Sequence, residues 1–261
     1  MFHNAYGVGG KTQTEAKMNV LNYVGNLNGI IANRPDVFMR IDSIKDMQEV
    51  MKNRKTGVMI GVQNADHFIS PDDVNLFNNL GQRVSQLTYN SRNMIGNGAT
   101  ERMDGGISDF GESIIKRMNE VGMAIDVSHC GDQTTLDAFE ISKKPVLITH
   151  SNVRSLNPNH PRCKTDEAII KMAKAGSVVG ITNVRNFVKA TEPTTIEHLL
   201  DQYDHVRDLV GSEHLGVGSD IDLYGYDAMP KKQYDALKAM YKGSYAFREK
   251  IDIEGIEKRN V

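Results

Sequence analysis

The stretch NEVGMAIDVSHCGDQTTLDAFEISKKPVLITH, residues Asn119 to His150, contains two apolar runs that each stop at a histidine. The amphipathic segment between these runs has the spacing of a helix, so the stretch predicts a strand-helix-strand unit. Parallel strands joined by a crossover helix end at the same edge of a sheet. We therefore expect His129 and His150 to converge at one rim, where two imidazoles indicate a metal site.

The same alternation of apolar runs and helical patterns continues along the chain to about residue 245. The opening residues 1–5 fit the tail of a further strand. Ser108, Asp132 and Thr165 each precede a helical run and are predicted N-caps. The expected strands cover residues 57–63, 83–89, 122–128, 145–149, 177–182 and 214–219, and the expected helices cover residues 14–33, 43–54, 72–80, 108–121, 132–142, 165–175 and 195–211.

Repeated strand-then-helix units predict a parallel sheet, and seven visible strands approach the eight at which such a pattern closes. We predict one (β/α)₈ domain over residues 1–261, a TIM-like barrel of the metal-dependent hydrolase type. The expected barrel lacks its first strand and helix and its last helix. An open doubly wound sheet is the alternative, and both folds place functional residues beyond the carboxyl ends of the strands.

Composition narrows the range of partners. Hydrophobic residues make up 39% of the chain and charged residues 25%, which is ordinary for a globular protein with a sizeable core. The formal charge of -2 and the absence of a basic run argue against nucleic acid, so a small molecule is the expected ligand. No stretch reaches the roughly 20 apolar residues that span a bilayer, so we expect no membrane segment.

Cys130 and Cys163 are the two cysteines, too few for a disulfide framework. They favour a reducing compartment, the cytoplasm, and the periplasm is the alternative if a leader was removed. No histidine and asparagine are spaced with either cysteine for thiol catalysis, so we interpret both as packing residues.

Polar side chains close most of the predicted strands. A lone histidine at a strand end more often satisfies a hydrogen bond than binds a metal. Two histidines on successive strands with an aspartate favour a cation such as zinc, which accepts imidazole and carboxylate ligands. The strand-end residues are His3, Asn4, Gln63, Asn64, Tyr89, Asn90, His129, His150, Asn183, Asp220 and Asp222.

Six segments carry a resemblance to a known family. They are GVQN (61–64), QLTYN (86–90), RMNEVGMAIDVSH (117–129), VLITHSN (146–152), PRCKTDE (161–167) and GVGSDID (216–222). In order and spacing the chain resembles the membrane dipeptidase, or renal dipeptidase, family of zinc metallopeptidases from about residue 57 to residue 225. The block that ends at His129 is the most specific of the six, whereas GVGSDID alone is weak.

This resemblance implies a (β/α)₈ barrel that hydrolyses dipeptides with two zinc ions sharing a bridging glutamate. It implies that His129 and His150 bind one zinc, and that Asp220 binds the other and transfers a proton. Arg162 matches the arginine that holds the substrate carboxylate, a task suited to a planar guanidinium. Asn152 and His160 are expected to line the substrate pocket beside it.

Three departures from the family pattern stand out. Gln63 replaces the bridging glutamate, and a neutral amide does not supply the negative charge that two adjacent cations require. No His-x-Asp pair precedes residue 57, because His3 and Asn4 are followed by alanine. Tyr89 replaces a histidine, although its phenol retains a hydrogen-bond donor for an oxyanion. Gln63 and Tyr89 together resemble a divergent bacterial-type branch of the family.

We therefore predict a hydrolase of a small amide or dipeptide with a free carboxylate, using one zinc held by His129 and His150 with Gln63 or water. Asp220 and Tyr89 are the predicted catalytic residues, and the second zinc site is in doubt. The alternative is a degenerate barrel that binds a small carboxylate without hydrolysis. A metal-dependent lyase or isomerase is a weaker third interpretation. The resemblance also implies a homodimer.

Overall fold

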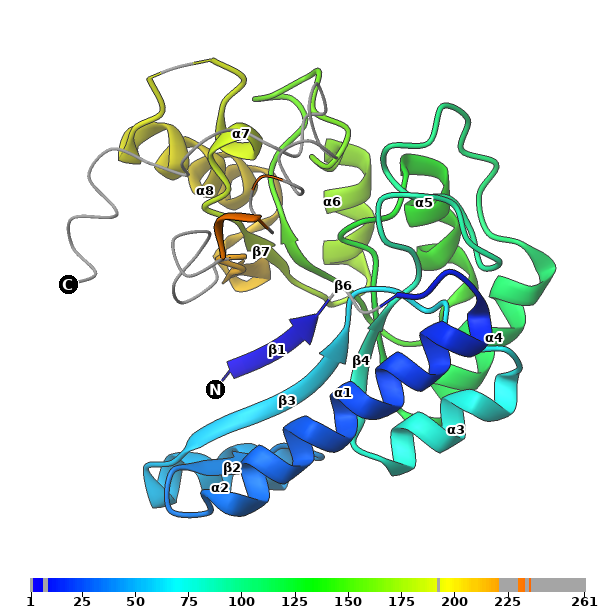
Figure 1. Ribbon diagram of the computed structural model, residues 1–261. Helices are drawn as coiled ribbons and strands as arrows, with labels where there is room; N and C mark the ends of the chain where they lie inside the picture. Colours follow the sequence, from blue (N-terminus) through cyan, green and yellow to red (C-terminus); the bar gives the residue numbers. More distant parts are fainter. Residues whose placement is uncertain (1, 7–8, 192, 221–229, 233–234, 236–261) are drawn as a thin grey trace. The chain divides into compact units, whose positions relative to one another are not determined.

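The computed structural model describes residues 2–6, 9–191, 193–220, 230–232 and 235 (Figure 1). Its chain divides into two compact units, Met1–Leu147 and Ile148–Val261, which are described separately below. The expected single domain over residues 1–261 stays a prediction. Asp222 lies outside the described residues.

The first unit is a parallel sheet with helices between its strands. Strands β1, β3, β4, β5 and the start of β6 follow one another in that order, and β2 pairs with the beginning of β3. The elements are β1 (Phe2–Tyr6), α1 (Gln13–Asn33), β2 (Phe38–Arg40), α2 (Ile44–Asn53), β3 (Thr56–Val62), α3 (Pro71–Asn79), β4 (Gln82–Gln86), α4 (Asp109–Val121), β5 (Ala124–Asp126), α5 (Asp132–Ile141) and β6 (Val146–Ser151).

The second unit continues the same pattern with the end of β6. Its strands are parallel in the order β6, β7, β8. The elements are α6 (Asp166–Lys174), β7 (Val179–Ile181), α7 (Arg185–Val188), α8 (Ile196–Val210), a 3₁₀ turn η1 (Ser212–His214) and β8 (Leu215–Val217). The expected strand from residue 214 therefore begins one residue later, because His214 closes the turn η1.

The core of the first unit lies between its sheet and its helices. Val58, Ile60 and Val62 of β3 are buried, and so are Ile114 and Ile115 of α4. Figure 1 shows α1 running along β3 and α3 lying beside α4 within this unit. Strands covered on both faces need near-continuous apolar sequence, which explains runs such as GVMIGV in β3.

Two of the three predicted helix caps are confirmed. Ser108 accepts a hydrogen bond from the backbone of Gly111, and Thr165 accepts one from Ala168. The prediction for Asp132 was wrong, because the N-cap of α5 is Gly131. The Asp104 carboxylate, from the preceding loop, accepts the free backbone N–H of Thr134 at 3.1 Å instead. A distant side chain thus satisfies the donor that we assigned to a local cap.

His67 is a fully buried histidine in the core of the first unit. Its ring lies 4.1 Å from that of Phe68 and 4.5 Å from that of Phe77, measured between centroids. Its Nε2 lies 3.1 Å from Oε1 of Gln82, so the neutral ring donates a hydrogen bond from Nε2 to this amide oxygen. Burial lowers the pKa of His67 from 6.5 to about 3, although Gln82 acts in the opposite direction. The folded protein therefore holds this ring neutral.

We expect His67 to make the protein sensitive to acid. Between the unfolded pKa of 6.5 and the folded pKa of about 3, the unfolded chain binds a proton that the folded chain does not. The free energy of unfolding then falls as the pH falls below 6.5, by up to about 1.4 kcal/mol per pH unit. Urea unfolding measures the free energy of unfolding at pH 7 and at pH 5. The decrease between these two pH values should be about 2 kcal/mol larger for wild type than for His67→Gln.

The matched control is His205→Gln, which alters a partly exposed histidine of α8. It should keep the wild-type difference between the two pH values. Equal acid losses in wild type and His67→Gln would show that His67 does not carry this sensitivity.

Candidate active site

The best-defined part of the site lies at the carboxyl ends of β4 and β5, in the first unit. The rings of Tyr89 and His129 stack with their centroids 4.1 Å apart and their planes 20° apart. Asn90 places its Oδ1 2.8 Å from Nδ1 of His129. His129 is only 5% exposed, whereas Tyr89 is 38% exposed. The structure thus brings together a predicted metal ligand and a predicted catalytic residue.

The bond to Asn90 determines which nitrogen of His129 is available to a metal. Because the amide oxygen of Asn90 accepts, Nδ1 of His129 carries the proton and the lone pair of the neutral ring is on Nε2. Metal-binding histidines commonly donate their second nitrogen to such an outer partner, which fixes the tautomer and the ring orientation. His129 therefore has the chemistry of a zinc ligand through Nε2.

The loop after Asn90 holds this arrangement in place. The carbonyl of Asn90 accepts from both the backbone and the hydroxyl of Thr100, and the carbonyl of His129 accepts from Ala99. Gly98 permits this close approach, since a Cβ there would lie 2.2 Å from the Asn90 carbonyl. A side chain at residue 98 would therefore push the loop away from Asn90 and His129, to which it is hydrogen-bonded.

A buried carboxylate supports the turn that leads to His129. Asp126 is completely buried and accepts hydrogen bonds from the side chain of Gln86 at 2.8 Å and from the backbone and hydroxyl of Ser128. Gln86 belongs to β4 and Asp126 to β5, so the bond ties the two strand ends together. Asp126 is not among the residues predicted to form the site. Its position inside the run AIDVSH, among residues we assigned to a strand, was the available signal.

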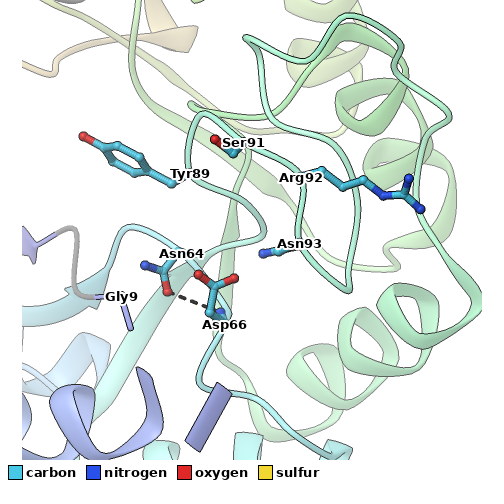
Figure 2. Close-up of a pocket in the computed structure, with 7 residues that line it drawn as sticks. All are labelled: Gly9, Asn64, Asp66, Tyr89, Ser91, Arg92 and Asn93. Carbon is cyan, nitrogen blue, oxygen red and sulfur yellow. Dashed lines mark hydrogen bonds between the residues drawn. The ribbon is translucent and has the colours of Figure 1, made fainter. Parts of the chain in front are cut away.

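A cavity of about 250 Å³ opens beside Tyr89, still within the first unit (Figure 2). Asn64 and Asp66 come from the segment after β3, and Tyr89 comes from the segment after β4. Gln63, the predicted ligand, follows β3 directly but is not among the lining residues, so its role stays a prediction. The lining residues are Gly9, Asn64, Asp66, Tyr89, Ser91, Arg92 and Asn93.

His150 and Asn152 lie in the second unit. His150 is a buried residue of β6, one position before the strand ends, and its Nδ1 lies 2.8 Å from the hydroxyl of Thr149. Asn152 is buried, and its amide bonds to the hydroxyl and the carbonyl of Thr182. These bonds tie Asn152 to the end of β7, and its contact with substrate stays a prediction.

Arg162 and His160 form a buried group with Phe187. The guanidinium carbon of Arg162 lies 5.2 Å from the centroid of the Phe187 ring, and the ring of His160 lies 4.4 Å from it. The backbone N–H of Arg162 donates to Nδ1 of His160 at 3.2 Å, and Nδ2 of Asn186 lies 3.1 Å from Nε2 of the same ring. This packing fixes a cation inside the unit, as recognition of a carboxylate requires.

Asp220 lies beyond β8 at the end of a described range. Its backbone has φ 55°, in the left-handed region that aspartate and asparagine adopt more readily than most residues. Its side chain is exposed.

The described residues contain no group of three or more histidine, cysteine, aspartate or glutamate side chains arranged around a metal position. His129 belongs to the first unit, and His150 and Asp220 belong to the second. Their convergence is therefore still the prediction made from the sequence. The neutral tautomer that Asn90 imposes on His129 fits a zinc ligand.

Both cysteines are buried thiols that form no disulfide with each other. Burial raises the pKa of the Cys163 thiol to about 12. Cys130 accepts a hydrogen bond from the hydroxyl of Thr88 at 3.3 Å. A thiol that stays protonated is a poor nucleophile, which supports the interpretation of Cys163 as a packing residue.

Parallel strands that alternate with helices, with histidines at the ends of two successive strands, are the arrangement expected of a TIM-barrel-like metallohydrolase. A family model described as membrane dipeptidase, peptidase family M19, matches residues 3–244. The chain belongs to this family. Within the described residues, every helix is either too short or too polar to span a lipid bilayer.

Individual proteins agree with this assignment. Dipeptidase verJ of Clonostachys rogersoniana is 35% identical over 181 residues, which are 68% of this chain and 46% of that protein. The chain thus spans about half the length of this curated relative. The crystal structure of an amidohydrolase from Pseudomonas aeruginosa matches with a TM-score of 0.79 and 29% identity, covering 96% of this chain and 73% of the other.

A metallopeptidase from Rhodobacter sphaeroides, solved with a phosphinate mimic of the dipeptide L-Ala-D-Ala, has a TM-score of 0.74 at 20% identity. The match covers 92% of this chain and 72% of the Rhodobacter sphaeroides chain. At this identity the likeness shows the fold alone. The predicted fold class, a TIM-like barrel of the metal-dependent hydrolase type, is confirmed by these structures.

Proposed function

We propose that the protein is a metal-dependent hydrolase of the dipeptidase type, acting on a small amide or dipeptide with a free carboxylate through one zinc ion. The observation that carries the proposal is the buried His129, held by Asn90 in the tautomer that a metal needs. Family membership over residues 3–244 supports it. His129 and His150 would hold the ion, with Gln63 or water completing its ligands.

The chemistry divides among this chain's own residues. When bound, zinc would lower the pKa of a water toward neutrality and so supply the nucleophile. Asp220 accepts the proton of the attacking water and passes it to the leaving nitrogen. Tyr89 is a residue that lines the cavity, and its hydroxyl donates to the oxygen of the carbonyl under attack. Arg162 binds the carboxylate of the substrate.

Gln63 favours a second candidate function. A glutamine leaves the family's bridging position without charge, and a barrel that has lost a metal site could bind a small carboxylate without cleaving it. This alternative predicts that the purified protein binds dipeptides but shows no turnover at any zinc concentration. Zinc retained on purification together with turnover would exclude it.

Arg162 provides the test of substrate recognition. We expect Arg162→Met to lower kcat/KM for a dipeptide by about 10–100-fold, because a charged hydrogen bond contributes about 1.5–3 kcal/mol. For a dipeptide amide, which lacks the carboxylate, the variant's kcat/KM should fall little. Steady-state kinetics with both substrates measures the difference.

The control is Arg207→Met, which removes an exposed arginine of α8 that pairs with Asp204 and Asp208. It should leave kcat/KM for both substrates unchanged, since exposed ion pairs contribute little to stability. If Arg162→Met lowers kcat/KM equally for both substrates, Arg162 does not recognise the carboxylate.

The homodimer and the cytoplasmic location also stay predictions. Sedimentation equilibrium of the purified protein tests the first, with twice the monomer mass expected. Fractionation of the source cells tests the second.

A further inference from the structure

The cavity contains a carboxyl group to which neither the sequence analysis nor the family resemblance gives a role. Asp66 lies half-buried three residues after Gln63, in the segment that follows β3. In Figure 2 its carboxylate lies between the side chains of Asn64 and Asn93, within the cavity that Tyr89 lines.

Hydrogen bonds hold Asp66 and its neighbours in position. The backbone N–H of Asp66 donates to Oδ1 of Asn64 at 3.3 Å, and the side chain of Asn93 bonds to the carboxyl group of Asp66. Asn93 is itself anchored, since its Oδ1 accepts from Ile95 and Gly96 and its Nδ2 donates to Leu87. The carboxyl group is thus placed by a rigid frame, as a recognition site requires.

The electrostatic surroundings of Asp66 favour a positively charged ligand. Burial raises the pKa of Asp66, and the bond from Asn93 only partly opposes this effect. Among the described residues no lysine or arginine pairs with it, and Figure 2 shows the guanidinium of Arg92 extending away from the carboxylate. A cation that enters the cavity would offset the cost of taking the carboxylate out of water.

The size and walls of the cavity distinguish an organic cation from a metal ion. A volume of about 250 Å³ exceeds the space of a bare ion. The described residues do not gather three acidic, histidine or cysteine side chains there, as a metal would need. Tyr89 adds an aromatic wall, and its ring is held by stacking on His129. An ammonium group is attracted both to a carboxylate and to an aromatic face.

We propose that Asp66 binds the ammonium group of a small ligand in this cavity. For the dipeptidase-type hydrolase proposed above, on which the identity of the ligand rests, this group is the free amino end of the substrate. Asp66 then selects substrates with an unmodified amino terminus, at the end opposite the carboxylate that Arg162 is expected to bind.

Calorimetric titration with two ligands tests the proposal. One ligand is the phosphinate mimic of L-Ala-D-Ala, which is not cleaved and carries a free amine, and the other is its N-acetylated form. We expect wild type to prefer the free amine, and Asp66→Asn to lower the ratio between the two affinities by about tenfold or more. Asp72→Asn removes an exposed carboxylate of α3 and should keep the wild-type ratio.

The outcomes separate this proposal from the proposed hydrolysis. An unchanged ratio in Asp66→Asn, failure of both mimics to bind wild type, or loss of zinc from Asp66→Asn by elemental analysis would each overturn the role of Asp66. If wild type binds the amine through Asp66 but cleaves no dipeptide, the hydrolase proposal fails and this inference stands. If wild type cleaves dipeptides and the affinity ratio is unchanged in Asp66→Asn, the role of Asp66 is wrong and the hydrolase proposal stands.

Discussion

Asp220→Asn is expected to lower kcat for a dipeptide by about 10²–10⁴-fold, the usual contribution of a general base or acid. The variant removes the proton acceptor but keeps a side chain of nearly the same size. Asparagine also tolerates the left-handed backbone at this position, where φ is 55°. The loss should therefore come from chemistry, and KM should change little.

Steady-state kinetics checks this expectation. Asp201→Asn, at an exposed position on α8, is measured in parallel as the control variant. The control should retain wild-type kcat. If Asp220→Asn also keeps wild-type kcat with zinc bound, Asp220 does not transfer the proton.

His129→Ala is expected to lose bound zinc and to retain less than about 1% of wild-type kcat/KM. Loss of an outer partner of a metal ligand typically weakens metal affinity about 10–100-fold, and loss of the ligand itself should exceed that. Asn90→Ala provides the graded case, because it removes the oxygen that holds Nδ1 of His129 at 2.8 Å. It should weaken zinc affinity by about 10–100-fold while excess zinc restores turnover.

Zinc content by elemental analysis and turnover with added zinc measure both variants. His205→Ala is the matched control, since this partly exposed histidine of α8 pairs with Asp166 and is not among the residues of the proposed site. Full zinc content in His129→Ala would remove His129 from the metal site.

The regular elements were predictable because their signals are local. Helix α4 begins one residue after Ser108, and α6 begins one residue after Thr165, as the caps required. Strand β2 (FMR) has two apolar residues followed by an arginine, and this apolar run is too short to indicate a strand. The four-residue α7 was missed for the same reason. Asp132 was misassigned because the residue that satisfies α5 comes from a loop 30 residues away.

The site was predictable only in part, for the same physical reason. His129 and Tyr89 follow apolar runs and so stood out as rim residues, and the structure stacks them. The partnership of Asn90 with His129 depends on chain segments 39 residues apart, and no local pattern encodes it. Asp66 lies three residues past the end of its apolar run, beyond the strand-end positions that the sequence analysis considered.

Anomalous scattering at the zinc edge, measured from crystals grown with zinc, locates the metal relative to the two histidines. One strong peak is expected within about 2.0–2.1 Å of Nε2 of both His129 and His150, with Asp220 facing the same position. No peak at these histidines, or a pair of equal peaks about 3.5–4 Å apart, would contradict a hydrolase with a single zinc.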